Sequence, residues 1–510
     1  MNLWHSIEPS QLICLSILVP LVGALLVVAT GKSPNLREAI TLITALVLFS
    51  IVLAITDYTF LGTELRLDVI ELFPGLGLNF EVEPLGVLFA LVASFLWIIT
   101  SIYAIGYMRS HKEENQTRFF CCFALAISSV MAICFSGNLL TLFVFYEILT
   151  LSTYPLVTHA GNDAAKQGGR IYLGILLSTS IVFLLFAILG TWSLTGTLDF
   201  RPGGIFSASD NKAVLSILLV LFCYGIGKAA IMPFHRWLPA AMVAPTPVSA
   251  LLHAVAVVKA GVFSILKVMI YIFGLDELKN LATTDIMLYI GAATILLSSC
   301  IAMTKDNLKA RLAYSTISQL SYIVVGALLA SSIASAGAAL HIATHAVGKI
   351  TLFFCAGAIM VASHKKNISE MVGLGRQMPI TMIAFAIGAI SIIGLPPMAG
   401  TWSKWYLIIG ALEVDKLIIV VVLMISSLLN IAYLLPIPIK AFFNTQGKEQ
   451  PSWSWADTKE APLACLIAIG VTSSTCILMF FYPQPLVDLI NLIPSVSTNL
   501  ESSSNLNGAG

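Results

Sequence analysis

The stretch GKAAIMPFHRWLPAAMVAPTPVSALLHAVAVVKAG, residues 227–261, joins two apolar runs through a proline-rich segment. Lys228 stands near its start, and His253 and Lys259 lie in the second apolar run. A charged side chain at bilayer depth costs roughly 2.5–3.5 kcal/mol or more, so each needs a partner or a polar path. A helix broken within a membrane, here first at Pro233, is tolerated where it is buried in protein or lines a cavity. The stretch therefore predicts an ion or proton pathway.

Composition places the whole chain in a membrane. Of its 510 residues, 58% are hydrophobic and 10% are charged, whereas soluble chains carry roughly 25% charged residues. The net charge of +1 argues against binding to nucleic acid. The nine cysteines show no CxxC or Cys/His ligand spacing, so we expect no metal site. No phosphate-binding glycine loop and no nucleophile–base pair is evident, so we expect neither a cofactor nor an enzyme active site.

Apolar runs near the ~20 residues that a bilayer requires repeat along the chain, and they predict an all-α polytopic membrane protein of about fourteen transmembrane helices. We place these spans near 11–30, 38–57, 83–107, 118–136, 138–159, 170–193, 212–232, 246–274, 284–303, 310–330, 334–362, 378–411 (broken), 416–440 and 461–482. The longest polar stretches are 57–83, 440–460 and a tail from about Pro483, which we expect to be disordered.

Basic residues predict the orientation. Most of the 27 lysines and arginines fall in alternate loops, which is the pattern of a positive-inside topology. This pattern places both termini on the outer side of a cell (inner) membrane. Lys267 lies near the end of its span, and we expect its side chain to extend to the membrane interface.

Glu147 is the acidic residue deepest in an apolar run, LLTLFVFYEILTLSTY (139–154). A lone buried carboxylate becomes neutral unless a cation pairs with it, and Lys228 is the obvious partner on a later span. A static buried pair that fixes helix packing is the alternative. Buried pairs contribute little net stability, so the pattern favours a functional pair.

The second half of the chain contains GAALHIATHAVGKITLFFCAG (337–357), in which His341, His345 and Lys349 share one helix face at four-residue spacing. Two histidines at this spacing can mark a metal site, but no carboxylate or cysteine is nearby and a lysine occupies the same face. A proton relay is favoured, because imidazole titrates near neutrality. The alternative for either histidine taken alone is a structural role, in which its ring is hydrogen-bonded to the backbone inside a helix bundle.

A second broken span follows in GLPPMAGTWSKWYL (394–407). Pro396 and Pro397 interrupt the helix, and Lys404 lies where the helix begins again. This arrangement mirrors Lys228 and Pro233. Interrupted segments in corresponding positions of two halves indicate inverted repeats. We therefore predict N-terminal helices in 1–110, a first repeat in 111–280, a second repeat in 281–445, and a last helix with a polar tail in 446–510.

Four ordered motifs resemble the proton-conducting antiporter-like subunits of Mrp-type cation/proton antiporters and of respiratory complex I. They are KAAIMPFHRWLPAAMVAPTPVSALLHAVAVVKAGVF (228–263), TKDNLKARLAYSTISQLSYI (304–323), HIATHAVGKITLFFCAG (341–357) and GLPPMAGTWSKW (394–405). The resemblance implies fourteen helices with two inverted five-helix repeats, helices 4–8 and 9–13, and discontinuous helices 7 and 12.

The resemblance also implies roles for the charged residues. Glu147 matches the family's helix-five glutamate, and opening or closing of its pair with Lys228 changes the proton affinity of that lysine. The proton then passes through Lys259 and the helix-eleven relay to the helix-twelve lysine near the exit. The remaining relay positions are His341, His345, Lys349 and Lys404, with His253 as a further candidate.

Lys404 resembles the lysine of the D-type subunit of Mrp-type antiporters and also that of two complex I subunits. The 510 residues do not provide the lateral helix and extra spans of the longest complex I subunit. We therefore predict the D-type subunit of an Mrp-type sodium or potassium/proton antiporter, which acts with other membrane subunits. The alternative is a proton-pumping subunit of a complex I-like oxidoreductase or membrane-bound hydrogenase, with redox cofactors on other chains. A purely structural scaffold leaves the charged axis unexplained. Many relatives carry an acidic residue just after WLP, where this chain has Ala240, Ala241 and Met242.

Overall fold

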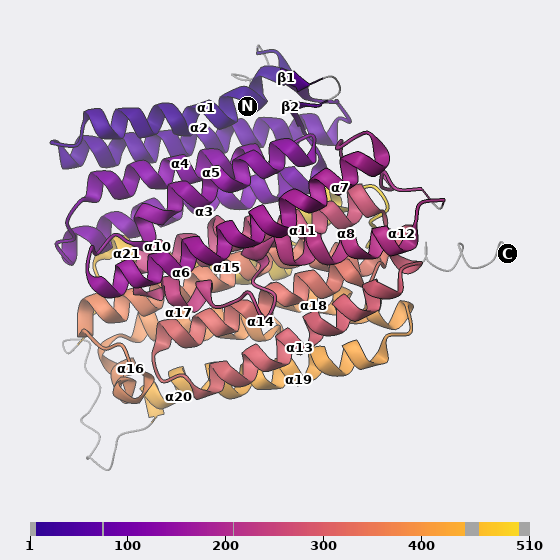
Figure 1. Ribbon diagram of the computed structural model, residues 1–510. Helices are drawn as coiled ribbons and strands as arrows, with labels where there is room; N and C mark the ends of the chain where they lie inside the picture. The colour runs from indigo at the N-terminus through magenta and orange to yellow at the C-terminus, as the bar shows by residue number, and fades with distance from the viewer. Residues whose placement is uncertain (1–6, 74–75, 208, 444–457, 499–510) are drawn as a thin grey trace.

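The computed structural model describes residues 7–73, 76–207, 209–443 and 458–498, and helices lying side by side dominate it (Figure 1). The elements are α1 (Pro9–Ala29), α2 (Pro34–Phe60), β1 (Arg66–Phe73), β2 (Leu76–Glu81), α3 (Pro84–Ser110), α4 (Gln116–Cys134), α5 (Leu139–Val157), α6 (Asp163–Thr179), α7 (Leu185–Thr195), α8 (Lys212–Gly225), α9 (Trp237–Ala240), α10 (Thr246–Ala250), α11 (Val257–Val268), α12 (Leu275–Lys279), α13 (Ala282–Thr304), α14 (Leu308–Leu328), α15 (Ser332–Ser363), α16 (Leu374–Gln377), α17 (Pro379–Ile393), α18 (Gly400–Glu413), α19 (Leu417–Leu434), α20 (Pro436–Phe443), α21 (Leu463–Phe481) and α22 (Gln484–Asn491).

Within the described residues, 11 helices are long and apolar enough to cross a membrane. The prediction of an all-α polytopic membrane protein is therefore confirmed. Two further apolar helices, α8 and α17, are shorter because each belongs to an interrupted span. The division of the chain into two repeats stays a prediction, and we use "first half" for 111–280 and "second half" for 281–445.

Both interrupted segments contain prolines that the sequence singled out. After α8, a short 3₁₀ turn at Gly227–Ala229 carries Lys228, and the chain passes Pro233 before α9 begins. Between α17 and α18, Gly394 has a φ of 86°, a left-handed conformation that glycine adopts without strain. Proline lacks the backbone N–H that a continuing helix requires, so no helix continues through either segment, although α8 already ends at Gly225, before Pro233.

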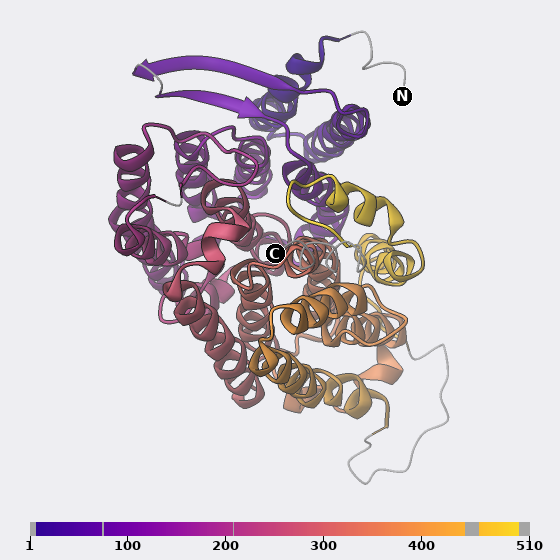
Figure 2. The same ribbon diagram turned by 90° about the vertical axis from the view of Figure 1, so that its right-hand side faces the viewer.

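A β-hairpin departs from the all-α pattern. It lies in the polar stretch 57–83 between two predicted spans, where β1 and β2 pair in antiparallel fashion, with Arg66 opposite Glu81. The segment RLDVIELF has the partly alternating apolar and polar residues of a strand. The hairpin extends along one edge of the bundle (Figure 2), and the Glu81 N–H donates to the Phe135 carbonyl (2.7 Å) beside the α4–α5 turn.

The long helix α15 (32 residues) forms the centre of the bundle. It begins after Ser331, whose hydroxyl accepts a hydrogen bond from the Ala334 N–H (3.1 Å). Among its neighbours are α3, α10, α11, α14, α17, α18 and α21. The helix α15 therefore contacts α11 and α18, which carry Lys259 and Lys404.

The carboxy-terminal region returns to the amino-terminal helices, since α21 packs against α3 (Figure 2). The prediction of a disordered tail from Pro483 is wrong for 484–498. Gln484–Asn491 forms α22, in which Leu489 and Ile490 are buried. Apolar residues of this segment stabilise it by packing against α3 and α15. The rest of the tail, 499–510, lies outside the described residues.

Candidate functional site

Lys228 is fully buried, and α5 supplies its partners. Its Nζ donates to the Tyr146 backbone carbonyl (2.8 Å) and to Thr150 Oγ1 (2.6 Å). The ammonium group also lies 3.1 Å from the centroid of the Tyr146 ring. Because these acceptors come from a neighbouring span, the lysine links the broken segment after α8 to α5.

Glu147 neighbours this site without pairing to it. No ion pair within 4.0 Å joins Glu147 to Lys228, although both residues are described. Both carboxylate oxygens of Glu147 are inaccessible to solvent and receive no hydrogen bond from the described residues. The predicted Glu147–Lys228 ion pair is therefore not formed, and Lys228 is bonded instead to the Tyr146 carbonyl.

The central contact joins the two halves of the chain. Lys259 on α11 and His345 on α15 are both buried, and Lys259 Nζ lies 2.6 Å from His345 Nδ1. His253 lies in the π-helical turn that precedes α11, and its ring centroid is 4.7 Å from that of Phe353 on α15. Neither ring nitrogen of His253 has a hydrogen-bond partner among the described residues.

From His345 a row of rings continues into the second half. The His345 and His341 centroids are 5.7 Å apart, and Tyr322 on α14 stacks on His341 at 5.5 Å. Lys404 Nζ lies 4.7 Å from the Tyr322 ring centroid. Lysine, imidazole and phenol groups therefore follow one another in a line from α11 to α18, in which neighbouring rings are stacked.

Hydroxyl and carbonyl oxygens hold the two lysines of the second half. Lys349 Nζ donates to Ser315 Oγ (2.6 Å), and Tyr433 in turn donates to the same oxygen (2.9 Å). Lys404 Nζ donates to the Ile393 carbonyl (2.9 Å), which the break after α17 leaves free of a helical partner, and to Ser427 Oγ (3.2 Å). Salt bridges within 4.0 Å are lacking at both lysines within the described part of the chain.

Sequence analysis missed these hydroxyl partners. Each belongs to an apolar span and faces the charged line: Tyr146, Thr150, Ser315, Tyr322, Ser403, Ser427 and Tyr433. Their only signal in the sequence was a hydroxyl within an apolar span, and it is weak because such a hydroxyl can also bond a backbone carbonyl, as Thr150 does with Tyr146. His341 also has a hydroxyl partner, since its Nδ1 lies 2.8 Å from Ser403 Oγ.

Lys267 does not extend to the membrane interface as predicted. Its side chain is fully buried, and its Nζ lies 3.2 Å from Glu83 Oε2 and donates to the Ser136 carbonyl (2.6 Å). Phe200 adds a cation–π contact at 4.4 Å. Glu83 precedes α3 and is far from Lys267 in sequence. The position of Lys267 within its span therefore could not indicate Glu83 as its partner.

The described residues contain no cluster of three His, Cys, Asp or Glu side chains able to hold a metal ion. The site consists instead of lysines, histidines, hydroxyl groups and one unpaired carboxylate. Such groups can hold, share and pass protons.

Residues 136–430 match the family model described as "NADH:quinone oxidoreductase/Mrp antiporter, TM", and residues 75–120 match "NADH-Ubiquinone oxidoreductase (complex I), chain 5 N-terminus". The chain belongs to this family of antiporter-like membrane subunits. The resemblance of its motifs to that family is confirmed.

Two curated relatives represent the two branches of the family. The chain is 33% identical over 383 residues to NADH-quinone oxidoreductase subunit N of Desulforudis audaxviator (strain MP104C), covering 74% of this chain and 75% of that protein. It is 31% identical over 515 residues to a probable K(+)/H(+) antiporter subunit of the A/B type from Rhizobium meliloti (strain 1021). That match covers 96% of this chain but 50% of the relative, so the chain spans about half of its length.

Two solved structures share the fold. One is the Mrp complex from Dietzia sp. DQ12-45-1b, with a TM-score of 0.84 and 21% identity over 100% of both chains. The other is the membrane-bound sulfane sulfur reductase, an archaeal respiratory membrane complex, with a TM-score of 0.82 and 22% identity over 97% of this chain and 99% of the other. The chain is accordingly an antiporter-like subunit of the kind found in Mrp and complex I-type assemblies.

Proposed function

We propose that this chain is the proton-translocating, D-type subunit of a multisubunit Na⁺(K⁺)/H⁺ antiporter. The contact between Lys259 and His345 carries the proposal, because it joins the two halves through two groups that exchange protons. At 2.6 Å, one proton lies between the two nitrogens and can belong to either. Neighbouring rings and hydroxyl groups extend this link towards Lys404.

Glu147 controls the start of the path in this mechanism. When its carboxylate turns towards Lys228, the attraction stabilises the ammonium form, and when it turns away, burial favours release of the proton. The released proton moves to Lys259, which lies on α11 packed against the turn that carries Lys228. His345, His341 and Lys349 then pass it along α15, and Lys404 delivers it to the far side.

The comparisons support the antiporter assignment through the fold of an Mrp complex and through a relative named as a K(+)/H(+) antiporter subunit. On this assignment the chain works with other membrane subunits in a cell (inner) membrane, with both termini outside. Protons and sodium or potassium ions are its substrates, and it carries no cofactor of its own.

A redox-driven assembly is the second candidate function. It is favoured by the 33% identity to NADH-quinone oxidoreductase subunit N over 74% of this chain. In this case the same line of residues moves protons, but the energy comes from electron transfer on partner chains. The two functions differ in their driving reaction and share the proposed path.

Everted vesicles from antiporter-deficient cells test the proposal when they express this chain with its neighbouring genes. After a proton gradient is formed, sodium or potassium is added, and collapse of the gradient is followed by acridine-orange fluorescence. We expect dequenching in the wild type and its loss in Lys228→Ala. Lys279→Ala is the matched control, because this exposed lysine is paired only with Asp276 on the surface.

The outcome separates the candidate functions. Cation-dependent dequenching that needs Lys228 but not Lys279 establishes cation/proton exchange. If cations give no response while NADH drives Lys228-dependent proton pumping, the redox-driven function replaces the antiporter function. Equal activity of wild type and Lys228→Ala in both assays rules out the proposed path.

A further inference from the structure

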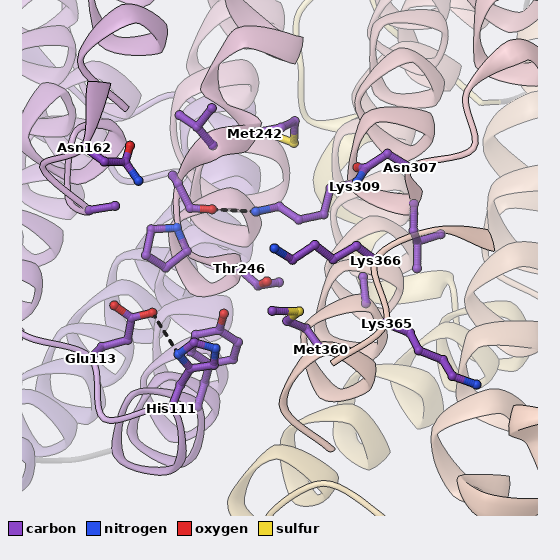
Figure 3. Close-up of a pocket in the computed structure, with 17 residues that line it drawn as sticks. His111, Glu113, Asn162, Met242, Thr246, Asn307, Lys309, Met360, Lys365 and Lys366 are labelled. Atoms are coloured by element: carbon purple, nitrogen blue, oxygen red, sulfur yellow. Dashed lines mark hydrogen bonds and ion pairs between the residues drawn. The ribbon is translucent and has the colours of Figure 1, made fainter. Parts of the chain in front are cut away.

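A pocket of about 430 Å³ opens at the end of the bundle where α14 begins and α15 ends (Figure 3). We call it the basic pocket. Lys309 and Lys366 direct their ammonium groups into it, and Met242, Pro245 and Met360 form apolar parts of its wall. The buried line of lysines and histidines described above does not include these residues.

Lys309 and Lys366 form no ion pair within 4.0 Å in the part of the chain that the structure describes. Lys309 Nζ donates to the Ala244 carbonyl at 2.5 Å, which leaves two of its three N–H groups unused. Lys366 makes no ion pair within 4.0 Å in the described part of the chain. The nearby carboxylate, Glu113, is directed at His111 with an N–O distance of 3.4 Å (Figure 3). Neither ammonium group therefore has an ion-pair partner within 4.0 Å among the described residues, although Glu113 also lines the pocket.

Backbone hydrogen bonds hold the two lysines in this arrangement. The Leu308 N–H donates to the Lys366 carbonyl (3.0 Å), and the Ile368 N–H donates to the Asp306 carbonyl (2.9 Å). The Ser369 hydroxyl adds a bond to Asp306 Oδ2 (2.7 Å). We call these contacts between 306–308 and 366–369 the latch. Because the latch joins the start of α14 to the segment after α15, the lysines are placed before any ligand arrives.

We propose that the basic pocket binds an anion of the phosphate class, either inorganic phosphate or the phosphodiester headgroup of an anionic lipid. A tetrahedral oxyanion has enough acceptor oxygens to bridge both ammonium groups, and it relieves their mutual repulsion. The N-terminus of α14 adds a favourable dipole at the same place. The apolar wall accommodates the carbon atoms of a lipid glycerol. Sodium and potassium ions are repelled from this pocket.

Titrations of the purified membrane assembly test this site. Inorganic phosphate is added at constant ionic strength against a chloride control, and the thermal unfolding midpoint is followed by tryptophan fluorescence. A second arm compares phosphatidylcholine nanodiscs with and without phosphatidylglycerol. A ligand that binds the folded state raises the midpoint in a saturable way. We expect Lys366→Gln to weaken the apparent affinity about tenfold or more, since it removes a hydrogen bond between charged groups.

Lys440→Gln is the matched control, because it removes an exposed lysine on α20 that does not line the pocket. A saturable phosphate effect that Lys366→Gln weakens identifies a free anion as the ligand. The same pattern with phosphatidylglycerol alone identifies a lipid headgroup. The proposal is overturned if neither probe gives a saturable effect, or if Lys366→Gln and Lys440→Gln behave alike.

Discussion

Two buried lysines, Lys267 and Lys228, have a glutamate nearby, and the two arrangements differ. Lys267 is paired with Glu83 at 3.2 Å and also bonded to the Ser136 carbonyl. Lys228 has Glu147 as a neighbour but uses the Tyr146 carbonyl and Thr150 instead. The first lysine is closed into an ion pair beside the β-hairpin, whereas the second is held by neutral oxygens within the bundle.

The difference separates a lysine in a structural ion pair, Lys267, from a lysine that can change its hydrogen-bond partners, Lys228. Breaking a buried ion pair by removing one partner is costly, because the other charge is left uncompensated. A lysine held by neutral acceptors can exchange them for a carboxylate at a smaller net cost. We therefore expect substitutions at Lys267 to act mainly on stability and substitutions around Lys228 to act mainly on transport.

The largest expected effect comes from Lys267→Ala. This substitution leaves the Glu83 carboxylate buried without its cation, and we expect a loss of about 3–5 kcal/mol in the free energy of unfolding. Denaturant unfolding of the purified protein in detergent measures it. The double variant Lys267→Met/Glu83→Gln removes both charges and should regain much of the loss. A single variant as stable as wild type would contradict the structural role of the pair.

Glu147→Gln should have the next largest effect, and on transport rather than stability. The carboxylate has no hydrogen-bond partner to lose among the described residues, so we expect a change in unfolding free energy below about 1 kcal/mol. Transport should fall on the order of 100-fold, the typical contribution of a positioned proton-transfer group. The vesicle assay and the unfolding assay together test this contrast. A large loss of stability with normal transport would contradict this prediction, because it would give Glu147 the structural role that we assign to Glu83.

Thr150→Val probes the neutral acceptors of Lys228. The variant keeps the shape of the side chain and removes an oxygen 2.6 Å from the ammonium group. A hydrogen bond to a charged group contributes about 1.5–3 kcal/mol, and we expect a stability loss near the lower value. Thr191→Val is the control, since that hydroxyl bonds only the Ala187 carbonyl of its own helix. Equal losses in the two variants would show that Lys228 does not depend on Thr150.

The smallest expected effect concerns the latch, which lies outside the membrane spans. Hydrogen bonds from Ser369 hold the pKa of the Asp306 carboxyl below its usual value of 3.8. Its stabilising contribution is therefore complete above about pH 3.8 and is lost as the pH falls through the lower folded-state pKa. The thermal midpoint of wild type should exceed that of Asp306→Asn at pH 7 and converge with it in acid. A difference that does not change with pH would exclude this role of the carboxylate.

Much of the site could be predicted because burying a charge in an apolar span is costly. Lys228, Lys259, Lys349 and Lys404 were recognisable for that reason alone, and all four are buried. Their partners were not recognisable, because a hydroxyl in a membrane span costs little and many spans contain one. Which hydroxyl faces which lysine depends on helix rotation and packing, and a single sequence does not state these.

The fold was predictable to a similar extent. Hydropathy identifies spans, but it says little about segments outside the bilayer, and there the predictions were incomplete or wrong. The β1–β2 hairpin and α22 both form from polar stretches that depend on docking against helices. Lys267 shows the same limit, since its position near a span end favours an exposed ammonium until Glu83 is placed beside it.

The central position of α15 has a consequence for the order in which the protein is made. Its two histidines and Lys349 face protein on all sides in the finished bundle. An isolated α15 released into lipid would expose these groups to hydrocarbon, at a cost of several kcal/mol. Helices α3, α11 and α14, which pack against α15, leave the ribosome before it and can shelter it as it emerges. We therefore expect the helices that precede α15 to guide its insertion into the membrane.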